Sequence, residues 1–207
     1  MSHLLGHEFS TFGLGEYGVS GFFMLSGFVL SVAYGRKIEA DQFLTRSFFL
    51  KQWAKLYPLH ITTFLLGIAY EAHYGNFYEW FRLVPPVFLV QSWIPNEWFH
   101  YIPNGSSWSL CAFFFFYTLF SFAYMWIHRL SLHRLLALLS MMLVAYFVVV
   151  LMIPERFVYA FVYPSPLMRL PEFILGIALC RLMRSKSGKA LASAFETRPL
   201  WQLTTSS

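Results

Sequence analysis

Residues 135–153, LLALLSMMLVAYFVVVLMI, carry no charge over a length that could cross a lipid bilayer. A spanning helix needs about 20 mostly apolar residues, because each residue advances the helix by about 1.5 Å. In a water-soluble protein, polar side chains would have to cover the outside of such a helix. This stretch offers almost none, so it predicts a membrane-spanning helix.

The composition extends this prediction to the whole chain. Of the 207 residues, 57% are hydrophobic, 21% are aromatic and only 12% are charged. Soluble domains average about 25% charged residues, so a water-soluble core is the lesser alternative. The expected fold class is all-α, a polytopic transmembrane helical bundle.

Apolar runs predict about five spans in total. Besides residues 135–153, they are residues 18–34, 59–70, 104–127 and 166–183. Pro58 suits the first turn of the helix at 59–70, because proline has no N–H to satisfy there. Residues 82–93, RLVPPVFLVQSW, are too proline-broken to span. We expect them to form a re-entrant or half helix, which is tolerated where protein or water covers its backbone.

Basic residues mark the connections that we expect on the cytoplasmic side. They are Arg36, Lys37, Arg46, Lys51 and Lys55 after the first span, Arg129 and Arg134 before the span at 135, and Arg184, Lys186, Lys189 and Arg198 near the end of the sequence. The polar tail, residues 185–207, is therefore expected in the cytoplasm. The net charge of +5 follows from this topology and from lipid headgroups, so it does not indicate a nucleic-acid partner.

The first span then runs from outside to inside with only residues 1–17 before it. That piece has no basic n-region and no long apolar h-region, so it is not a signal peptide. We therefore expect that a helix delivering it to the outside is missing from the sequence.

The segment FLTRSFFLKQWAKLY, residues 43–57, has two interpretations. Its alternating aromatic and basic residues are typical of an interfacial helix anchored among lipid headgroups. Alternatively, Lys51 and Lys55, one helical turn apart, bind the phosphates of a nucleotide-like donor. His60, at the start of the second span, is expected to be a polar cap at the membrane interface.

Arg169 and Glu172 are three residues apart, so a helix places them on one face, where they can pair. Charges at membrane depth usually mark a functional site or a bundle interior. The equal alternative is that the last span starts later and that the pair rests at the outer interface.

Other polar residues give weaker signals. Ser26 and Gly27 indicate close helix packing more than a contact with substrate. His3 and His7 could act as general bases, because the unperturbed pKa of histidine lies near neutrality. No spacing of histidine, cysteine and carboxylate residues indicates a metal site.

Four segments, in this order, resemble the membrane-bound acyltransferase family 3, whose members O-acylate carbohydrates of cell envelopes and secreted metabolites. They are GVSGFFMLSGFVLS (18–31), FLKQWAKLYPLH (49–60), NGSSWSLCAFFFFY (104–117) and RLPEFILGIAL (169–179). The resemblance covers nearly the whole chain and implies a membrane acyltransferase domain over residues 1–184, in the inner membrane of a bacterium.

The resemblance implies transfer of an acyl group, acetyl above all, from acyl-CoA to a carbohydrate hydroxyl. Acyl-CoA would be a co-substrate, with no permanently bound cofactor. The implied acceptor-site residues are Asn104, Ser107, Trp108, Ser109, Arg169 and Glu172, with Ser26 as a further candidate, and the implied donor-site residues are Lys51, Gln52, Lys55 and Tyr57. His3 stands near the position of the family's presumed catalytic histidine.

The sequence also departs from the family pattern. The expected glutamate falls at Phe113, and the two arginines of the basic segment fall at Gln52 and Lys55. Lysine lacks the bidentate fork with which arginine recognises phosphate. The family's first helix, with its early arginine, is not in the sequence. We therefore interpret the chain as a partial acyltransferase with impaired catalysis.

Two functions of other classes remain open. A catalytically inactive scaffold or binding subunit would keep the helices without the carboxylate at position 113. A small-molecule transporter would need a polar path at membrane depth, for which Arg169 and Glu172 are the hint in the sequence.

Overall fold

The computed structural model describes residues 5–154, 157 and 162–185, with side chains described from Gly18 onward except that of Glu97. The described part is all-α. Its elements are α1 (Leu5–Glu39), α2 (Thr45–His73), α3 (Trp80–Val87), the 3₁₀ helix η1 (Gln91–Trp93), α4 (Glu97–His100), α5 (Ser107–Arg129), α6 (Leu132–Met152) and α8 (Pro166–Arg184). The expected fold class is thus confirmed at the level of an all-helical chain.

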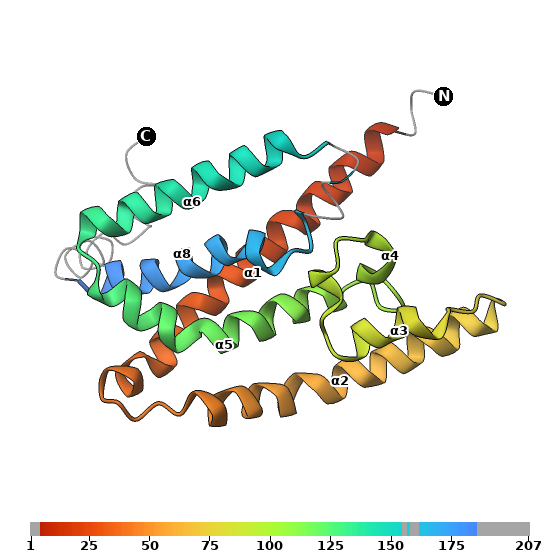
Figure 1. The fold of residues 1–207 in the computed structure, drawn as a ribbon, viewed down its shortest axis with the longest axis horizontal. Coiled ribbons are helices and arrows are strands. Elements are labelled where there is room, and N and C mark those ends of the chain that lie inside the picture. The colour runs from red at the N-terminus through yellow and green to blue at the C-terminus, as the bar shows by residue number, and fades with distance from the viewer. Residues whose placement is uncertain (1–4, 155–156, 158–161, 186–207) are drawn as a thin grey trace, which may run out of the picture.

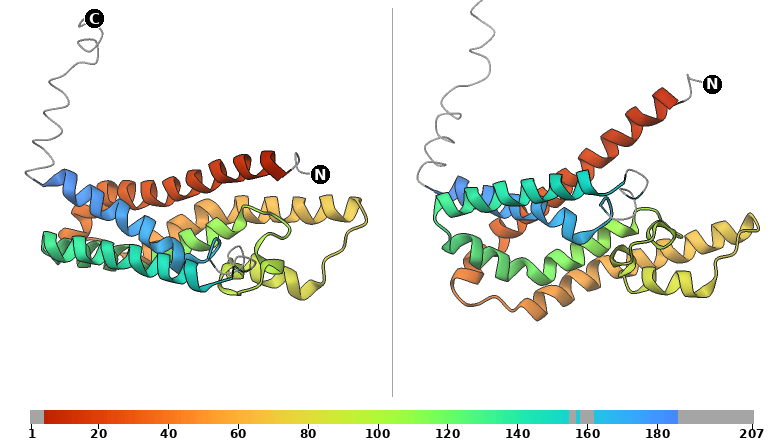
Figure 2. Two further views of the ribbon diagram at one scale, coloured as in Figure 1. Left: turned by 90° about the horizontal axis from the view of Figure 1, so that it is seen from above. Right: turned by 45° about the horizontal axis from the view of Figure 1, so that its top comes forward.

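The long helices alternate in direction along the bundle (Figures 1 and 2). The ends of α1 and α8 and the connection between α5 and α6 gather at one end, which we call the basic end because Arg36, Arg129 and Arg184 belong to these segments. The start of α5 and the helices α3 and α4 lie toward the other end. Between α2 and α5 the chain forms the short helices α3, η1 and α4 and no long helix.

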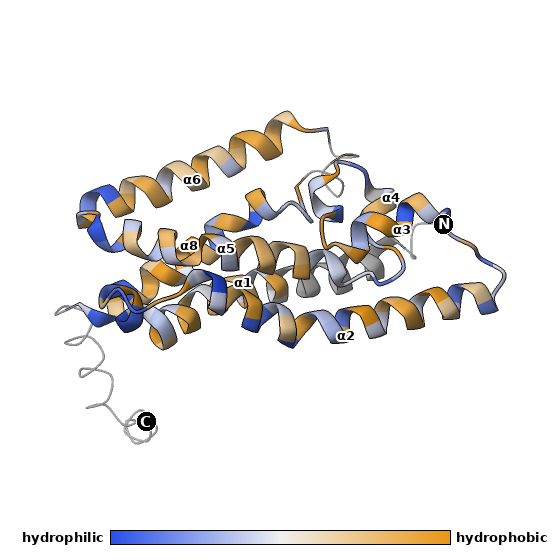
Figure 3. Ribbon diagram, turned by 60° about the horizontal axis from the view of Figure 1, so that its bottom comes forward, coloured by the Kyte–Doolittle hydropathy of each residue, from blue (hydrophilic) through white to orange (hydrophobic). Residues whose placement is uncertain are grey.

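Among the residues that the structure describes, three helical stretches are long and apolar enough to cross a membrane: Gly18–Glu39, Ser107–Arg129 and Leu132–Met152. These candidate spans coincide with three of the five predicted ones. Figure 3 shows α6 as apolar along nearly its whole length, with hydrophilic residues at its start. The helices α2 and α8 form where the other two spans were predicted, but they are less apolar.

The helix α2 differs from the prediction, because it begins at Thr45 and runs through Pro58 to His73. Pro58 lies inside this helix rather than in its first turn, and residues 43–57 do not form a separate interfacial helix. The helix is also displaced along the bundle. The Thr45 hydroxyl lies 3.0 Å from that of Ser121 in the middle of α5, while Thr63 already meets Asn104, before α5 begins.

This displacement corrects the expected positions of both halves of α2. Its basic half runs alongside α5 rather than at the basic end of the bundle. Its apolar half, residues 59–70, lies largely beyond the start of α5. The physical reason is tertiary: the Asn104 side chain donates to Thr63 at 3.0 Å, and Gly67 packs against Pro103, which fixes α2 against the loop before α5.

The short helix α3 packs against the second half of α2. Its last carbonyl groups cannot find partners within the helix, and α2 supplies them. The Tyr57 hydroxyl donates to the Val87 carbonyl at 3.1 Å, and His60 Nε2 lies 3.0 Å from the Pro86 carbonyl. His60 is only 1% exposed, so the expected interfacial cap is wrong: this histidine is a buried partner of α3.

The centre of the bundle is the contact between α1 and α8. A Cβ atom at Gly27 would overlap the Phe173 carbonyl, and one at Gly176 would overlap the Met24 carbonyl. Glycines at these positions let the two backbones touch, as small residues do between membrane helices. The packing role expected next to Ser26 is therefore confirmed at Gly27.

The aromatic residues of α5 pack against this pair of helices. The Phe116 ring stacks on that of Phe173 with centroids 4.9 Å apart, and it lies edge-on to Phe23 at 5.3 Å. Phe116 is fully buried. The run of phenylalanines after the polar loop therefore places α5 against both α1 and α8, which positions the residues at the start of α5.

Candidate functional site

An ion pair lies in the first turns of α8. Arg169 donates through Nη1 to Glu172 Oε1 at 2.9 Å, which confirms the pairing predicted from their spacing. Arg169 is only 6% exposed. Because a buried charge is costly without a partner, the carboxylate of Glu172 is what allows the guanidinium to lie at this depth in the protein.

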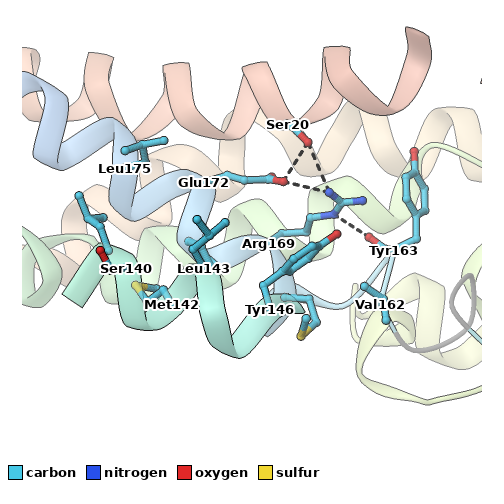
Figure 4. A pocket seen from close by; sticks show the side chains of 13 residues that line it. Ser20, Ser140, Met142, Leu143, Tyr146, Val162, Tyr163, Arg169, Glu172 and Leu175 are labelled. Atoms are coloured by element: carbon cyan, nitrogen blue, oxygen red, sulfur yellow. Dashed lines mark hydrogen bonds and ion pairs between the residues drawn. The ribbon is translucent and has the colours of Figure 1, made fainter. Parts of the chain in front are cut away.

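Two residues from other segments complete the group. The Ser20 hydroxyl on α1 donates to Glu172 Oε1 at 2.8 Å, and Arg169 Nε donates to the backbone carbonyl of Tyr163 at 2.8 Å. Figure 4 shows the three side chains of Ser20, Arg169 and Glu172 pointing toward one another. Neither Ser20 nor Tyr163 was predicted from the sequence, although Ser20 belongs to the GVSGFF segment. We call these four residues the Arg169 cluster.

Aromatic rings connect the Arg169 cluster to the start of α5. The Arg169 guanidinium lies 4.7 Å from the centroid of the Tyr163 ring and 5.9 Å from that of Trp108. The two rings themselves are 4.7 Å apart. Cations are attracted to the faces of such rings, so Trp108 and Arg169, predicted separately from two motifs, belong to one site.

A cavity of about 700 Å³ opens beside the Arg169 cluster, between α6 and α8. Its polar residues include Ser20, Arg169 and Glu172, and much of its remaining wall is apolar. The apolar contributors include Leu139, Met142 and Leu143 of α6 and Met168 and Leu175 of α8. Glu172 Oε2 is buried and has no hydrogen-bond partner among the described residues.

Residues 104–109 do not line this cavity, although Trp108 lies near Arg169. The Ser107 hydroxyl donates to the Asn104 carbonyl at 2.8 Å and accepts from Gln91 at 3.2 Å, and the Ser109 hydroxyl donates to the Ser106 carbonyl at 2.8 Å. These bonds start α5 and attach it to η1. The polar character of the loop therefore has a structural cause at Asn104, Ser107 and Ser109.

Ser26 also lies apart from the Arg169 cluster. It is half-buried in α1, and its side chain lies near that of Tyr117 on α5. This contact joins two helices in the interior of the bundle. Ser26 is thus not brought together with the residues that line the cavity.

The predicted donor-site residues lie on two different faces of α2. Lys51 and Lys55 are exposed, whereas Gln52 and Tyr57 are half-buried. Trp53 packs on Phe114 of α5 with centroids 4.8 Å apart, and Tyr57 stacks on Trp53. Because the lysines are on the face opposite Trp53, α2 and α5 stand between them and the Arg169 cluster.

The position of His3 lies outside the described residues. The helix α1 begins at Leu5, fifteen residues before Ser20, which is about 22 Å along a helix at 1.5 Å per residue. The described start of α1 is therefore far from the cavity. Within the described residues, no group of three histidine, cysteine, aspartate or glutamate side chains could hold a metal ion.

Comparison with known proteins shows the family of this chain. The acyltransferase domain of the acyltransferase 3 family matches residues 2–200. The chain belongs to the acyltransferase 3 family. The resemblance seen in the four motifs is thereby confirmed, and with it the assignment to a family of integral membrane acyltransferases.

Two curated relatives match this acyltransferase 3 chain. It is 37% identical over 127 residues to acyltransferase MdmB of Streptomyces mycarofaciens, an alignment that covers 59% of this chain and 32% of MdmB. It is 50% identical over 50 residues to protein 2 in the picA locus of Rhizobium radiobacter, covering 24% of this chain and 26% of that protein. The chain thus spans about a third or less of these relatives, and no solved structure matches it.

Phe113 stands where the resemblance of the motifs predicts a glutamate in this acyltransferase 3 chain. Phe113 is half-buried, with its ring centroid 4.9 Å from Phe23 and stacked with Tyr117 at 6.0 Å. A phenyl ring in this position can neither accept a proton nor orient a hydroxyl. Phe113 is therefore part of the aromatic packing between α1 and α5.

Proposed function

We propose that this chain acts in the transfer of an acyl group, acetyl in the first instance, from acyl-CoA to a carbohydrate hydroxyl at a bacterial inner membrane, with its C-terminus in the cytoplasm. The family membership supports acyl transfer. The observation that carries the site is a buried, ion-paired Arg169 beside a cavity with an unpartnered carboxylate oxygen. The acceptor would be a carbohydrate of the cell envelope or of a secreted metabolite.

In this proposal, the acceptor oxygen attacks the thioester carbonyl while a base removes the hydroxyl proton. The C–S bond breaks, the thiolate takes up a proton, and an ester and free CoA result. Glu172 would hold the acceptor hydroxyl through a charge-assisted hydrogen bond. Arg169 and Ser20 would fix the orientation of Glu172 through its other oxygen.

The structure gives more support to an acceptor site in this chain than to an acyl-CoA site. The Arg169 cluster is assembled from three segments, whereas Lys51 and Lys55 are exposed on a separate face of α2. The candidate base, His3, precedes α1, whose described start is far from the cavity. We therefore expect this chain by itself to bind acceptor and to cleave acyl-CoA slowly.

A second candidate function is a binding subunit without catalysis. The specific observation that favours it is Phe113, whose ring packs against Phe23 where the family pattern has a carboxylate. Such a subunit would bind the acceptor and associate with a complete enzyme.

The test is to incubate the chain, reconstituted in lipid nanodiscs, with radiolabelled acetyl-CoA and a panel of sugars. Acyl transfer should be slow and should fall further in the Glu172→Gln variant. The matched control is Glu79→Gln, at an exposed glutamate that directly precedes α3 and does not line the cavity. Rapid turnover that His3→Ala abolishes would contradict the expectation of impaired catalysis. Acceptor binding without any thioester cleavage would favour the binding subunit.

A further inference from the structure

Glu172 lines the cavity, and its two carboxylate oxygens differ in their hydrogen-bond partners. Its Oε1 accepts from Ser20 at 2.8 Å and from Arg169 at 2.9 Å, while Oε2 is buried without a partner among the described residues. An ionised carboxylate can only accept hydrogen bonds, and a buried acceptor without a donor is destabilising. A small rotation of Glu172 toward the cavity that it lines would pair this oxygen with a ligand group that donates, such as a hydroxyl.

The charges beside the cavity select against ionic ligands. Among the residues that the structure describes, Arg169 and Glu172 are the charged ones that line it, and they neutralise each other across 2.9 Å. An anion placed against Oε2 would be repelled by the carboxylate, and a cation would compete with Arg169 for it. A neutral, hydroxylated group avoids both penalties.

The opposite wall of the cavity is suited to an apolar group. It is formed largely by α6, through Leu139, Met142 and Leu143, with Leu175 of α8 beside them. The same helix adds the hydroxyl groups of Ser140 and Tyr146 to the lining. Methionine side chains adapt to ligands of irregular shape. The volume of about 700 Å³ lies in the range of about 300–1,000 Å³ typical of small-molecule sites and exceeds what one sugar ring fills.

We propose that this cavity binds a neutral amphipathic acceptor, with a hydroxylated head on Glu172 Oε2 and an apolar group against Met142 and its neighbours on α6. The inference rests on the proposed function and names its acceptor class: a glycoside with an apolar aglycone or lipid, rather than a free sugar or an anionic one.

The first measurement is binding of hexyl β-D-glucoside, glucose and hexan-1-ol to the chain in nanodiscs by equilibrium dialysis, with empty nanodiscs subtracted. Hexyl glucoside should bind at least tenfold more tightly than glucose, because each buried methylene group adds favourable free energy. Equal affinities for glucose and hexyl glucoside would overturn the proposal. Competition by membrane-resident hexadecyl glucoside would indicate delivery from the bilayer, and its failure would indicate delivery from water.

Two variants test the binding of the hydroxylated head and of the apolar group separately. Glu172→Gln should weaken hexyl glucoside about tenfold, the usual order for losing a hydrogen bond to a charged group, and should leave hexan-1-ol unchanged. Met142→Trp should weaken both by filling the cavity, whereas Met141→Trp, at an adjacent exposed methionine that does not line it, should weaken neither. Equal effects of the two tryptophan variants would overturn the proposal.

Failure of this inference can be told apart from failure of the proposed function. Acyl transfer to free sugars without preferential glycoside binding would overturn the amphipathic acceptor and leave acyl transfer standing. Glycoside binding that depends on Glu172 and Met142, without thioester cleavage, would support the acceptor class and overturn catalysis by this chain.

Discussion

Gly176 of α8 lies directly against the main-chain carbonyl of Met24 in α1, with no room for a methyl group between them. We expect Gly176→Ala to destabilise the protein by about 1–3 kcal/mol, because overpacking forces the two helices apart. Gly18→Ala is the matched control, since nothing lies within 4 Å of a Cβ there. Denaturation in mixed detergent micelles measures both, and equal stabilities would contradict the close contact.

The Arg169–Glu172 pair predicts a non-additive response to mutation. Arg169→Met alone should destabilise the protein by about 3–5 kcal/mol, because it leaves a partly buried carboxylate uncompensated, whereas Arg169→Met with Glu172→Met should cost much less. The same denaturation assay provides the double-mutant cycle. A double variant that is as unstable as the sum of the two single variants would show that the residues do not act as a pair.

We predict that replacing Phe113 with glutamate increases acyl-transfer activity. In Phe113→Glu, we expect acetyl-CoA turnover to rise, if the missing carboxylate limits catalysis, and stability to fall because the charge lies near the Phe23 ring. Phe113→Gln is the control of similar size without the charge. The measurement is acetyl-CoA turnover by each variant in nanodiscs. Unchanged turnover in a folded Phe113→Glu protein would favour the binding subunit.

A charge reversal at Lys55 tests the predicted location of the acyl-CoA site. If the exposed face of α2 holds the phosphates of acyl-CoA, Lys55→Glu should lower the affinity for acetyl-CoA about tenfold, and the affinity should fall with added salt. Lys37→Glu, at the end of α1, changes the charge equally and should have little effect. Equilibrium dialysis with labelled acetyl-CoA distinguishes the two variants. Equal losses would indicate a general effect of charge rather than a site.

Helix bounds were predictable where a single helix carries its own signal. The spans predicted at 104–127, 135–153 and 166–183 agree within a few residues with α5, α6 and α8. Uncharged runs bounded by polar residues fix the ends of the first two, and Pro166 marks the start of the third. The Arg169–Glu172 pair was predictable for the same reason, since a spacing of three residues is local.

Relationships between segments were not predictable in this way. Pro58 suits the first turn of a helix, yet α2 runs through it, and the contact of Asn104 with Thr63 displaces α2 along α5. Ser20 joins Glu172 across 152 positions of sequence. The sequence around Ser20 does not show whether this serine belongs to a site or packs between membrane helices, because small residues are common in such packing.

The hydrogen bonds that Tyr57 and His60 make to the end of α3 bear on the order in which the chain is made. The last two carbonyls of α3 have partners on a helix that leaves the ribosome earlier, so the end of this proline-broken segment does not have to enter lipid with these groups unsatisfied. Residues 80–87 can fold onto α2 as soon as they emerge. Biogenesis of this part of the membrane domain can then proceed in sequence order, without waiting for α5 or α8.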